Sequence, residues 1–156
     1  MVLNGLVRFV GKLLRIDHSL NKPFKKIAVV KFKGLGSIVQ ATPMLKTIRL
    51  NFPEAEIIFI TTIQNKALVE MLDFVNTGVY LDDRSIFKLM SSLPMFILKL
   101  IRMRIEVLFD LEVYSNMSSI ICTLSCATNR FGYYLSSSQY RMGLYTNMML
   151  LMKTIK

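Results

Sequence analysis

The sequence predicts an α/β fold, a Rossmann-like parallel β-sheet with helices on both faces. Three observations lead to this fold class. Short apolar segments alternate with helical patterns, the first of these segments is followed directly by a glycine turn, and that turn opens into a helix. Strands that alternate with helices are joined by right-handed crossovers, so we expect neighbouring strands to run parallel.

The first strand follows a polar connector at residues 17–25. Lys26–Phe32 is apolar at its centre without alternation, which is typical of a strand buried on both faces of a parallel sheet. Gly34-Leu35-Gly36-Ser37 ends this strand, and apolar residues at helical spacing follow. Thr42-Pro43 indicates an N-cap and a proline at the first helical position, so the main helix begins there after a preliminary turn and ends at Asn51-Phe52-Pro53.

Four further strands and three helices are expected downstream. The strands fall at Glu56–Thr61, Gly78–Leu81, Ile105–Asp110 and Arg130–Tyr134, and the helices at Asn65–Leu72, Ile86–Arg104 and Ser115–Cys126. We expect Pro94 to break the longest helix, because proline lacks the amide hydrogen that an α-helix requires. The pattern decays after Leu135, so the predicted domain spans residues 26–135 and is followed by a truncated tail at 136–156.

Composition suits one globular domain, with 156 residues of which 53% are hydrophobic and 19% charged. The net charge of +10 is uneven, because residues 1–33 hold eight of the 20 basic residues and Asp17 as their single acidic residue. This asymmetry predicts an anionic partner near the N-terminus. We expect no nucleic-acid partner, because the aromatic residues do not interleave with the basic ones as a base-stacking platform requires.

The basic residues Arg8, Lys12 and Arg15 recur along one face of a predicted helix at residues 1–16, and apolar residues occupy its other side. Such a helix can lie in the interface of an anionic membrane, with these three side chains contacting the headgroups. The alternatives are a helix that packs on the domain and a helix that binds a partner protein. No apolar run reaches the roughly 18–20 residues of a spanning helix.

Cys122 and Cys126 lie four residues apart in an apolar stretch. We interpret them as two buried, reduced thiols on one helix face. A zinc site would need about four ligands, and the single histidine, His18, is distant in sequence. We therefore expect no metal site.

Ligands of parallel α/β sheets bind beyond the carboxyl ends of the strands. This rule selects Lys33–Ser37, Thr61–Asn65, Asp82–Arg84, Asp110–Ser115 and the residues after Tyr133. Gly34 and Gly36 let the backbone turn tightly and approach a ligand, and a helix N-terminus behind them offers free amides and a partial positive charge. A glycine turn alone is weak evidence, because many α/β proteins use one purely for geometry.

The wider string KIAVVKFKGLGSIVQATPMLKTIRLNFPEAEIIFIT resembles the N-terminal signature of glycosyltransferase family 9, the heptosyltransferase-like enzymes of lipopolysaccharide assembly. The matching pieces are Lys26–Phe32, Gly34-Leu35-Gly36, Ala41-Thr42-Pro43, Leu45, Arg49, Phe52–Ile57, Phe109-Asp110-Leu111 and Arg130-Phe131-Gly132. The resemblance covers residues 25–134 and is more specific than a glycine motif.

The resemblance implies the N-terminal half of a GT-B glycosyltransferase, in which two Rossmann-like domains face a cleft. The N-terminal domain receives the acceptor, and the C-terminal domain holds a nucleotide-sugar donor, typically ADP-heptose; no other cofactor is expected. The implied reaction is inverting transfer, in which a general base removes the proton of the attacking acceptor hydroxyl. The implied acceptor-binding residues are Gly34, Gly36, Ser37, Thr42 and Asp110.

Ser37 departs from the family pattern. Members commonly carry an aspartate at this position, where it is thought to act as the base. A serine hydroxyl is not basic near neutral pH, so we expect Ser37 to cap the helix or to hydrogen-bond the acceptor. Asp110 is a candidate substitute, as are Asp82, Asp83 and Glu112, although the sequence favours a structural or solvated carboxylate for each. The sequence leaves the catalytic base unassigned.

The donor-binding domain is the second departure, because no second set of alternating strands and helices is present. We expect the chain to be an acceptor-binding half that is inactive alone, either truncated or completed by a separate chain that supplies the donor domain. Its expected partners are a lipopolysaccharide or other lipid-linked glycan acceptor and an anionic membrane surface, which implies a cytoplasmic location, peripheral on the inner face of the cytoplasmic membrane.

Two alternatives stay open. One is a non-catalytic membrane-surface or ligand-binding module derived from a glycosyltransferase domain, which Ser37 and the basic N-terminal segment favour. The other is a small nucleotide-binding Rossmann protein. The second is less favoured, because the second predicted strand ends at Thr61-Thr62 without the acidic residue that would hold a ribose.

Overall fold

The computed structural model describes residues 18–20, 23–134, 141 and 144–150, which excludes the predicted N-terminal helix with Arg8, Lys12 and Arg15. The described strands form one parallel sheet in the order β3-β2-β1-β4-β5-β6. They are β1 Lys26–Val30, β2 Glu56–Thr62, β3 Thr77–Leu81, β4 Val107–Asp110, β5 Asn129–Tyr134 and β6 Asn147–Leu150. The predicted fold class is confirmed.

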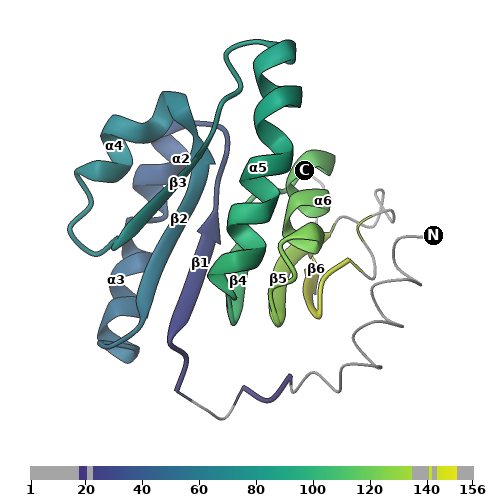
Figure 1. The fold of residues 1–156 in the computed structure, drawn as a ribbon. Helices are drawn as coiled ribbons and strands as arrows, with labels where there is room; N and C mark the ends of the chain where they lie inside the picture. Colours follow the sequence, from purple (N-terminus) through teal and green to yellow (C-terminus); the bar gives the residue numbers. More distant parts are fainter. Residues whose placement is uncertain (1–17, 21–22, 135–140, 142–143, 151–156) are drawn as a thin grey trace, which may run out of the picture.

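Helices cover both faces of the sheet (Figure 1). They are α2 Leu35–Gln40, α3 Thr42–Asn51, the short 3-10 helix η1 Ile63–Asn65, α4 Lys66–Glu70, α5 Ile86–Met103 and α6 Asn116–Leu124. Helices α2, α3 and α4 pack on one face, and α5 and α6 pack on the other. The connection from β3 to β4 therefore carries the chain back across the sheet, and it places β4 beside β1.

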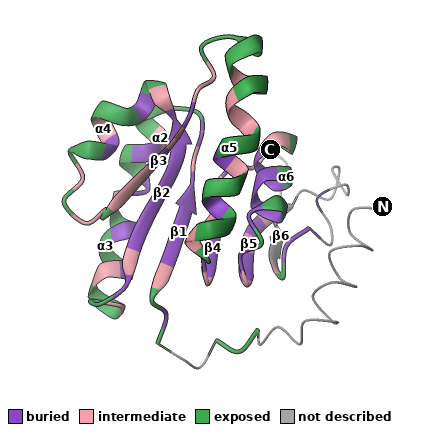
Figure 2. Cartoon of the chain, viewed as in Figure 1, coloured by how far each residue is buried: buried purple, intermediate pink, exposed green. Residues whose placement is uncertain are grey.

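Strand β1 lies at the centre of the sheet and is buried on both faces (Figure 2). Ala28 and Val30 join the apolar core beneath α5 and α6, whereas Ile27 and Val29 join the core beneath α2, α3 and α4. This division follows from the alternation of side chains along a strand. It explains why the strand shows no alternation in its sequence.

Arg49, one of the residues of the family-like string, has a structural role. Its guanidinium donates to the backbone carbonyls of Pro53 and Ala55, at 2.8 and 2.9 Å, and to the side-chain oxygen of Asn76. Asn76 in turn accepts a hydrogen bond from the backbone amide of Ile57 at 2.8 Å. These contacts hold the turn between α3 and β2 next to the start of β3, at the amino end of the strands.

The predicted N-caps are wrong. Helix α3 begins at Thr42 with Ala41 as its N-cap, and α2 begins at Leu35 with Gly34 as its N-cap. Neither helix start has a side-chain cap. Ala41 keeps a helical backbone between the two helices, so Thr42 and Ser37 both lie inside helical turns, where their hydroxyls cannot reach the free amides that a cap satisfies.

Pro94 does not break α5, which runs without interruption from Ile86 to Met103. Proline removes the hydrogen bond to the carbonyl four residues earlier, which belongs to Met90. Met90 and Pro94 both lie on the exposed side of the helix, so water can donate to that carbonyl. The helix therefore tolerates a proline that would break it on its buried side.

Cys126 and the C-terminal region also differ from the prediction. Helix α6 ends at Leu124, and Cys126 has a left-handed backbone with φ of 56°. Cys122 is buried and Cys126 is exposed, so the two free thiols do not share a buried helix face. Strand β6 pairs in parallel with β5 through Asn147 to Leu150, so the sheet extends past residue 135 into the segment predicted as a tail.

Candidate functional site

The turn after β1 and the loop after β4 meet at the point where the strand order reverses. Strands β1 and β4 are hydrogen-bonded neighbours, yet the helices that follow them leave toward opposite faces. Ligands of open α/β sheets bind at such a point, beyond the carboxyl ends of the strands. The predicted segments Lys33–Ser37 and Asp110–Ser115 therefore flank the same edge of the sheet.

Gly34 gives the turn after β1 its shape. Its φ of 86° lies in the left-handed region that side chains rarely adopt. Its carbonyl accepts hydrogen bonds from the amides of Ser37 and Ile38 at 3.0 and 3.1 Å, which start α2. Gly34 and Gly36 are exposed and Ser37 is half-buried, so the turn presents its backbone to solvent.

Glu112 anchors this turn from the loop after β4. Its Oε1 accepts hydrogen bonds from the backbone amides of Phe32 and Lys33, both at 2.9 Å. Its Oε2 lies 3.3 Å from the ammonium of Lys31. Because Glu112 is buried, these charge-assisted bonds are shielded from water and hold the two loops together.

Asn65 holds the carbonyl of Phe32, the residue whose amide Glu112 binds. Its Nδ2 donates to the carbonyl of Phe32 at 2.9 Å and to the hydroxyl of Thr61 at 2.8 Å. Both backbone polar groups of Phe32 are thus fixed by buried side chains from neighbouring strand ends. The glycine turn consequently begins from a rigid base.

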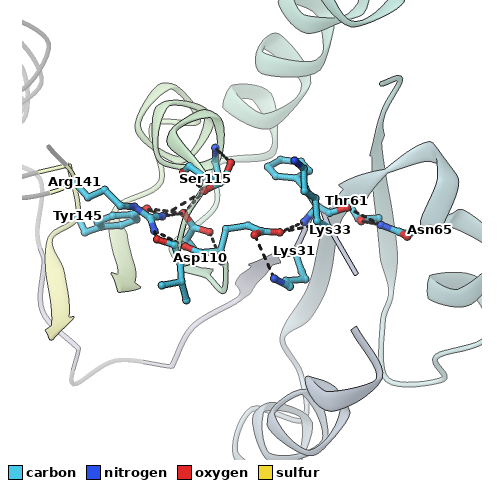
Figure 3. A network of polar contacts seen from close by, with 12 residues as sticks. Lys31, Lys33, Thr61, Asn65, Asp110, Ser115, Arg141 and Tyr145 are labelled. Atoms are coloured by element: carbon cyan, nitrogen blue, oxygen red, sulfur yellow. Dashed lines mark hydrogen bonds and ion pairs between the residues drawn. The ribbon is translucent and has the colours of Figure 1, made fainter. Parts of the chain in front are cut away.

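Asp110 lies in a buried polar cluster beside α6 (Figure 3). Its Oδ2 accepts hydrogen bonds from Ser118, Arg141 and Tyr145, at 2.9, 2.8 and 2.5 Å. Its Oδ1 accepts the backbone amide of Glu112 at 2.9 Å. The carboxylate therefore ties the end of β4 to α6 and to the segment before β6, with both oxygens occupied by donors from the chain itself.

Arg141 is fully buried with Asp110. Nη2 of Arg141 donates to Asp110, and Nη1 donates to the backbone carbonyls of Glu112 and Val113. Burial raises the pKa of Asp110 and of Tyr145, and it raises the pKa of the Cys122 thiol well above its usual range. The phenol and the thiol therefore stay protonated and serve as donors and packing groups.

The aspartates after β3 differ from each other. Asp82 accepts two hydrogen bonds from the guanidinium of Arg84, at 2.9 and 2.7 Å, and one from the backbone amide of Arg84, at 3.2 Å; these bonds lower the pKa of Asp82 to about 2. Asp83 has one buried carboxylate oxygen with no hydrogen-bond partner among the described residues. Among the contacts of the described residues, Asp83 is the one of the four carboxylates named from the sequence with a buried oxygen that accepts no hydrogen bond, but β2 separates its strand from β1.

The structure thus brings Gly34, Gly36 and Ser37 together, with Glu112 beneath them. Asp110 lies at the adjacent strand end but faces Arg141 and Tyr145, and half-buried Thr42 lies at the start of α3, one helix further on. Sequence reasoning missed the anchoring role of Glu112 and Asn65, although both fall in segments that the strand-end rule selected. Arg141 and Tyr145 fall among the residues after Tyr133 that the strand-end rule selected, but nothing in the sequence singled out either residue.

Two further properties of the described residues bear on the site. Across residues 18–20, 23–134, 141 and 144–150, no group of three or more His, Cys, Asp and Glu side chains is placed to hold a metal ion. None of the helices in this part of the chain is both long and apolar enough to cross a membrane.

Comparison with known proteins supports the fold. The sequence matches no protein-family model and no curated protein. A family 9 glycosyl transferase from Veillonella parvula superposes with a TM-score of 0.73 at 16% identity, over 88% of this chain and 39% of its own. The ADP-heptose lipopolysaccharide heptosyltransferase II of E. coli gives 0.66 at 17% identity, over 81% and 35%.

A third solved structure is similar to the same extent. It is the E. coli heptosyltransferase WaaC bound to ADP-2-deoxy-2-fluoro heptose, with a TM-score of 0.68 at 12% identity over 83% of this chain and 44% of its own. The chain therefore has the α/β fold of these glycosyltransferases and spans less than half of their length. The fold-level resemblance predicted from the sequence is confirmed.

Proposed function

We propose that this chain is the acceptor-binding half of a heptosyltransferase-like glycosyltransferase, and that a donor-binding domain completes it. The completed enzyme transfers a sugar from a nucleotide sugar such as ADP-heptose to lipopolysaccharide or another glycan. The observation that carries this proposal is the exposed turn Gly34–Ser37, which lies at the strand-order reversal on a base fixed by Glu112 and Asn65.

The chemistry assigned to this half is positioning. An exposed backbone turn can approach a sugar closely, and the Ser37 hydroxyl can donate to or accept from an acceptor hydroxyl. Holding an acceptor in a reactive orientation supplies a large part of a transfer reaction's rate, even without proton transfer. We propose Gly34, Gly36 and Ser37 as the acceptor-binding residues, with Thr42 behind them.

Asp110 fits a structural role better than the role of a base. A general base must reach the acceptor hydroxyl with a free lone pair. Both oxygens of Asp110 are occupied by four donors and the side chain is buried. We therefore propose that Asp110 positions the loop after β4, and we leave the base unassigned.

Exposed apolar side chains at the edge of the site support the proposal that a second domain covers it. Leu35 and Val39 on α2 are 56% and 55% exposed, and Tyr114 in the loop after β4 is 77% exposed. These apolar side chains follow the two strands that flank the strand-order reversal. Apolar surface at a ligand-binding edge is typical of a region that a second domain or a ligand covers. A donor-binding domain is the proposed partner of this edge.

The proposed location is the inner face of the cytoplasmic membrane, where a lipid-linked acceptor would be met. The basic residues Arg8, Lys12 and Arg15 support it, because they fall on one side of a predicted helix. They lie outside the described residues, so this part of the proposal rests on the sequence pattern.

A transfer assay tests the half-enzyme proposal. The purified chain is incubated with ADP-heptose and a lipopolysaccharide core acceptor, alone and with a donor-binding domain supplied as a second polypeptide. We expect no product from the chain alone and product only from the mixture. Turnover by the chain alone would contradict the proposal, and acceptor binding without turnover in the mixture would favour a non-catalytic module, which Ser37 also favours.

A further inference from the structure

Helix α5 carries more apolar surface than its packing requires. Its buried face consists of Phe96 and Leu100, with Leu89 and Leu93 packed beside them against the sheet. Away from that face, Ile86 and Phe87 are 82% and 83% exposed. A helix on a domain surface usually needs an apolar stripe of only about 100° and is polar elsewhere. The additional apolar residues on α5 therefore indicate a surface that a partner covers.

The exposed apolar residues form a second stripe along the helix. They recur at spacings of three and four residues, which places them above one another on one side of an α-helix. The members are Ile86, Met90, Pro94, Leu98 and Ile101, with Phe87 beside the first turn. Met95, which is 67% exposed, lies outside this stripe, on the side of the helix that carries the cations. The stripe runs for most of the length of α5, and Figure 2 shows this helix largely exposed on its outer side.

The charge along this stripe has one sign. Lys88, Lys99 and Arg102 are exposed on α5, and residues 86–104 contain no acidic residue. Helix α6, the other helix on this face of the sheet, also contains none, and it exposes Ile120 and Leu124. Exposed acidic residues do occur on the opposite face, at Glu70 and Asp73.

We propose that the outer face of α5 docks on an anionic lipid surface, with the stripe Ile86–Ile101 inserted among the headgroups and the three cations contacting phosphates. Apolar side chains beside lysine and arginine without acidic neighbours are the signature of an interfacial helix. A second copy of the same face would bring like charges together, so charge disfavours self-association through α5. This surface is separate from the glycine turn and does not depend on the proposed transferase activity.

Helix α5 begins at the carboxyl edge of the sheet, so part of the proposed docking surface lies there. The helix starts just after Asp82–Ser85, at the carboxyl end of β3, and its first turns extend beyond the sheet on the side where β1 points (Figure 1). The most exposed apolar residues of α5, Ile86 and Phe87, lie in these first turns, so docking through them brings lipid to the carboxyl edge of the sheet. That edge is where the turn Gly34–Ser37 lies.

A single tryptophan tests the proposal directly, because the native sequence contains none. Phe87→Trp places the probe on the stripe, and Leu50→Trp places a matched probe on α3, where Leu50 is 82% exposed on the opposite side of the sheet. We expect the emission of the Phe87→Trp chain to shift to the blue with vesicles of phosphatidylcholine and phosphatidylglycerol, and to be quenched by brominated lipid. The Leu50→Trp chain should show neither change.

Co-sedimentation with the same vesicles measures the affinity. Phe87→Ser combined with Met90→Ser should weaken binding by about tenfold or more, because two large apolar contacts are lost. Lys99→Gln and Arg102→Gln should each weaken it by about fivefold. Leu50→Ser combined with Met71→Ser, two equally exposed apolar side chains elsewhere, should leave binding unchanged. All these side chains are exposed, so circular dichroism should report an unaltered fold.

Three outcomes would overturn the proposal. The first is no binding to anionic vesicles. The second is equal binding to phosphatidylcholine alone, which would remove the role of the cations. The third is binding without a change at the Phe87→Trp probe, which would assign the membrane contact to another surface such as residues 1–16. None of these outcomes bears on acceptor binding at the glycine turn, so the two proposals fail separately.

Discussion

The carboxylate of Glu112 accepts the backbone amide hydrogen of Phe32 at 2.9 Å and so joins the end of β4 to the end of β1. The two residues are 80 positions apart in the sequence. Their contact lies directly beneath the glycine turn, and it is reinforced by the ion pair between Glu112 and Lys31. The geometry of the candidate site therefore depends on a buried carboxylate that does not itself face the ligand.

Replacement of this carboxylate should loosen the turn. Glu112→Gln removes the charge that pairs with Lys31 and turns an amide NH2 toward a cation, so we expect the free energy of unfolding to fall by about 1–3 kcal/mol. Urea denaturation measures this loss. Glu70→Gln is the matched control, because Glu70 pairs with Lys66 on an exposed helix surface and should change stability by less than about 0.5 kcal/mol. Equal effects of the two substitutions would contradict the anchoring role.

Gly132 should be intolerant of any side chain. A Cβ built at this position would lie 2.4 Å from the ring of Tyr145, so alanine must displace the tyrosine whose hydroxyl donates to Asp110. We expect Gly132→Ala to lower the free energy of unfolding by about 1–3 kcal/mol. Gly36→Ala is the control, because a Cβ there meets no atom within 4 Å. A stable Gly132→Ala chain would show that Tyr145 does not pack as described.

Asp82 should titrate at an unusually low pH. The hydrogen bonds from Arg84 lower the pKa of Asp82 to about 2, compared with an ordinary value of 3.8. A lowered folded-state pKa means that the contribution of the pair to stability is present above about pH 4 and is lost as the pH falls toward 2. Carboxyl NMR titration should find the low value, and Arg84→Ala should return it toward 3.8. An unchanged pKa in Arg84→Ala would exclude Arg84 as the cause.

The two cysteines should differ in reactivity. Cys126 is exposed, whereas Cys122 is buried and its raised pKa keeps the thiolate form scarce. We expect a thiol reagent such as Ellman's reagent to modify one thiol per native chain and two after unfolding in urea. Cys126→Ser should abolish the native reaction. A fast reaction of Cys122 in the native chain would indicate that the cluster around Asp110 opens readily.

Local sequence patterns predicted the central strand and the glycine turn, because the residues that determine these elements are neighbours in the sequence. Residues 27–30 are uniformly apolar, the chain turns at a glycine with positive φ, and the strand-end rule then placed Gly34, Gly36, Ser37 and Asp110 at one edge. These features depend on neighbouring residues alone. The sequence could therefore predict that the glycine turn ends the first strand and that it is a candidate ligand-binding site.

The missed features depend on contacts between distant residues. The sequence identified Asp110 only as a carboxylate at a strand end, because the partners that bury it, Arg141 and Tyr145, lie 31 and 35 residues further on. Strand β6 forms by pairing with β5, and its residues Asn147–Leu150 fall in the segment that the sequence predicted as a tail. Pro94 could be placed correctly only once the exposed side of α5 was known. Pairing and burial of this kind are set by tertiary context rather than by local propensity.

The central claim is that the turn Gly34–Ser37 receives the acceptor. Amide NMR spectra of the isotope-labelled chain, titrated with a lipopolysaccharide core oligosaccharide, test it most directly. We predict that the largest shifts fall on the amides of Gly34, Gly36 and Ser37, and that Gly36→Ala keeps the fold but weakens binding by about tenfold, because its methyl group blocks close approach of the sugar. Shifts confined to other surfaces, or unchanged binding by Gly36→Ala, would contradict the account.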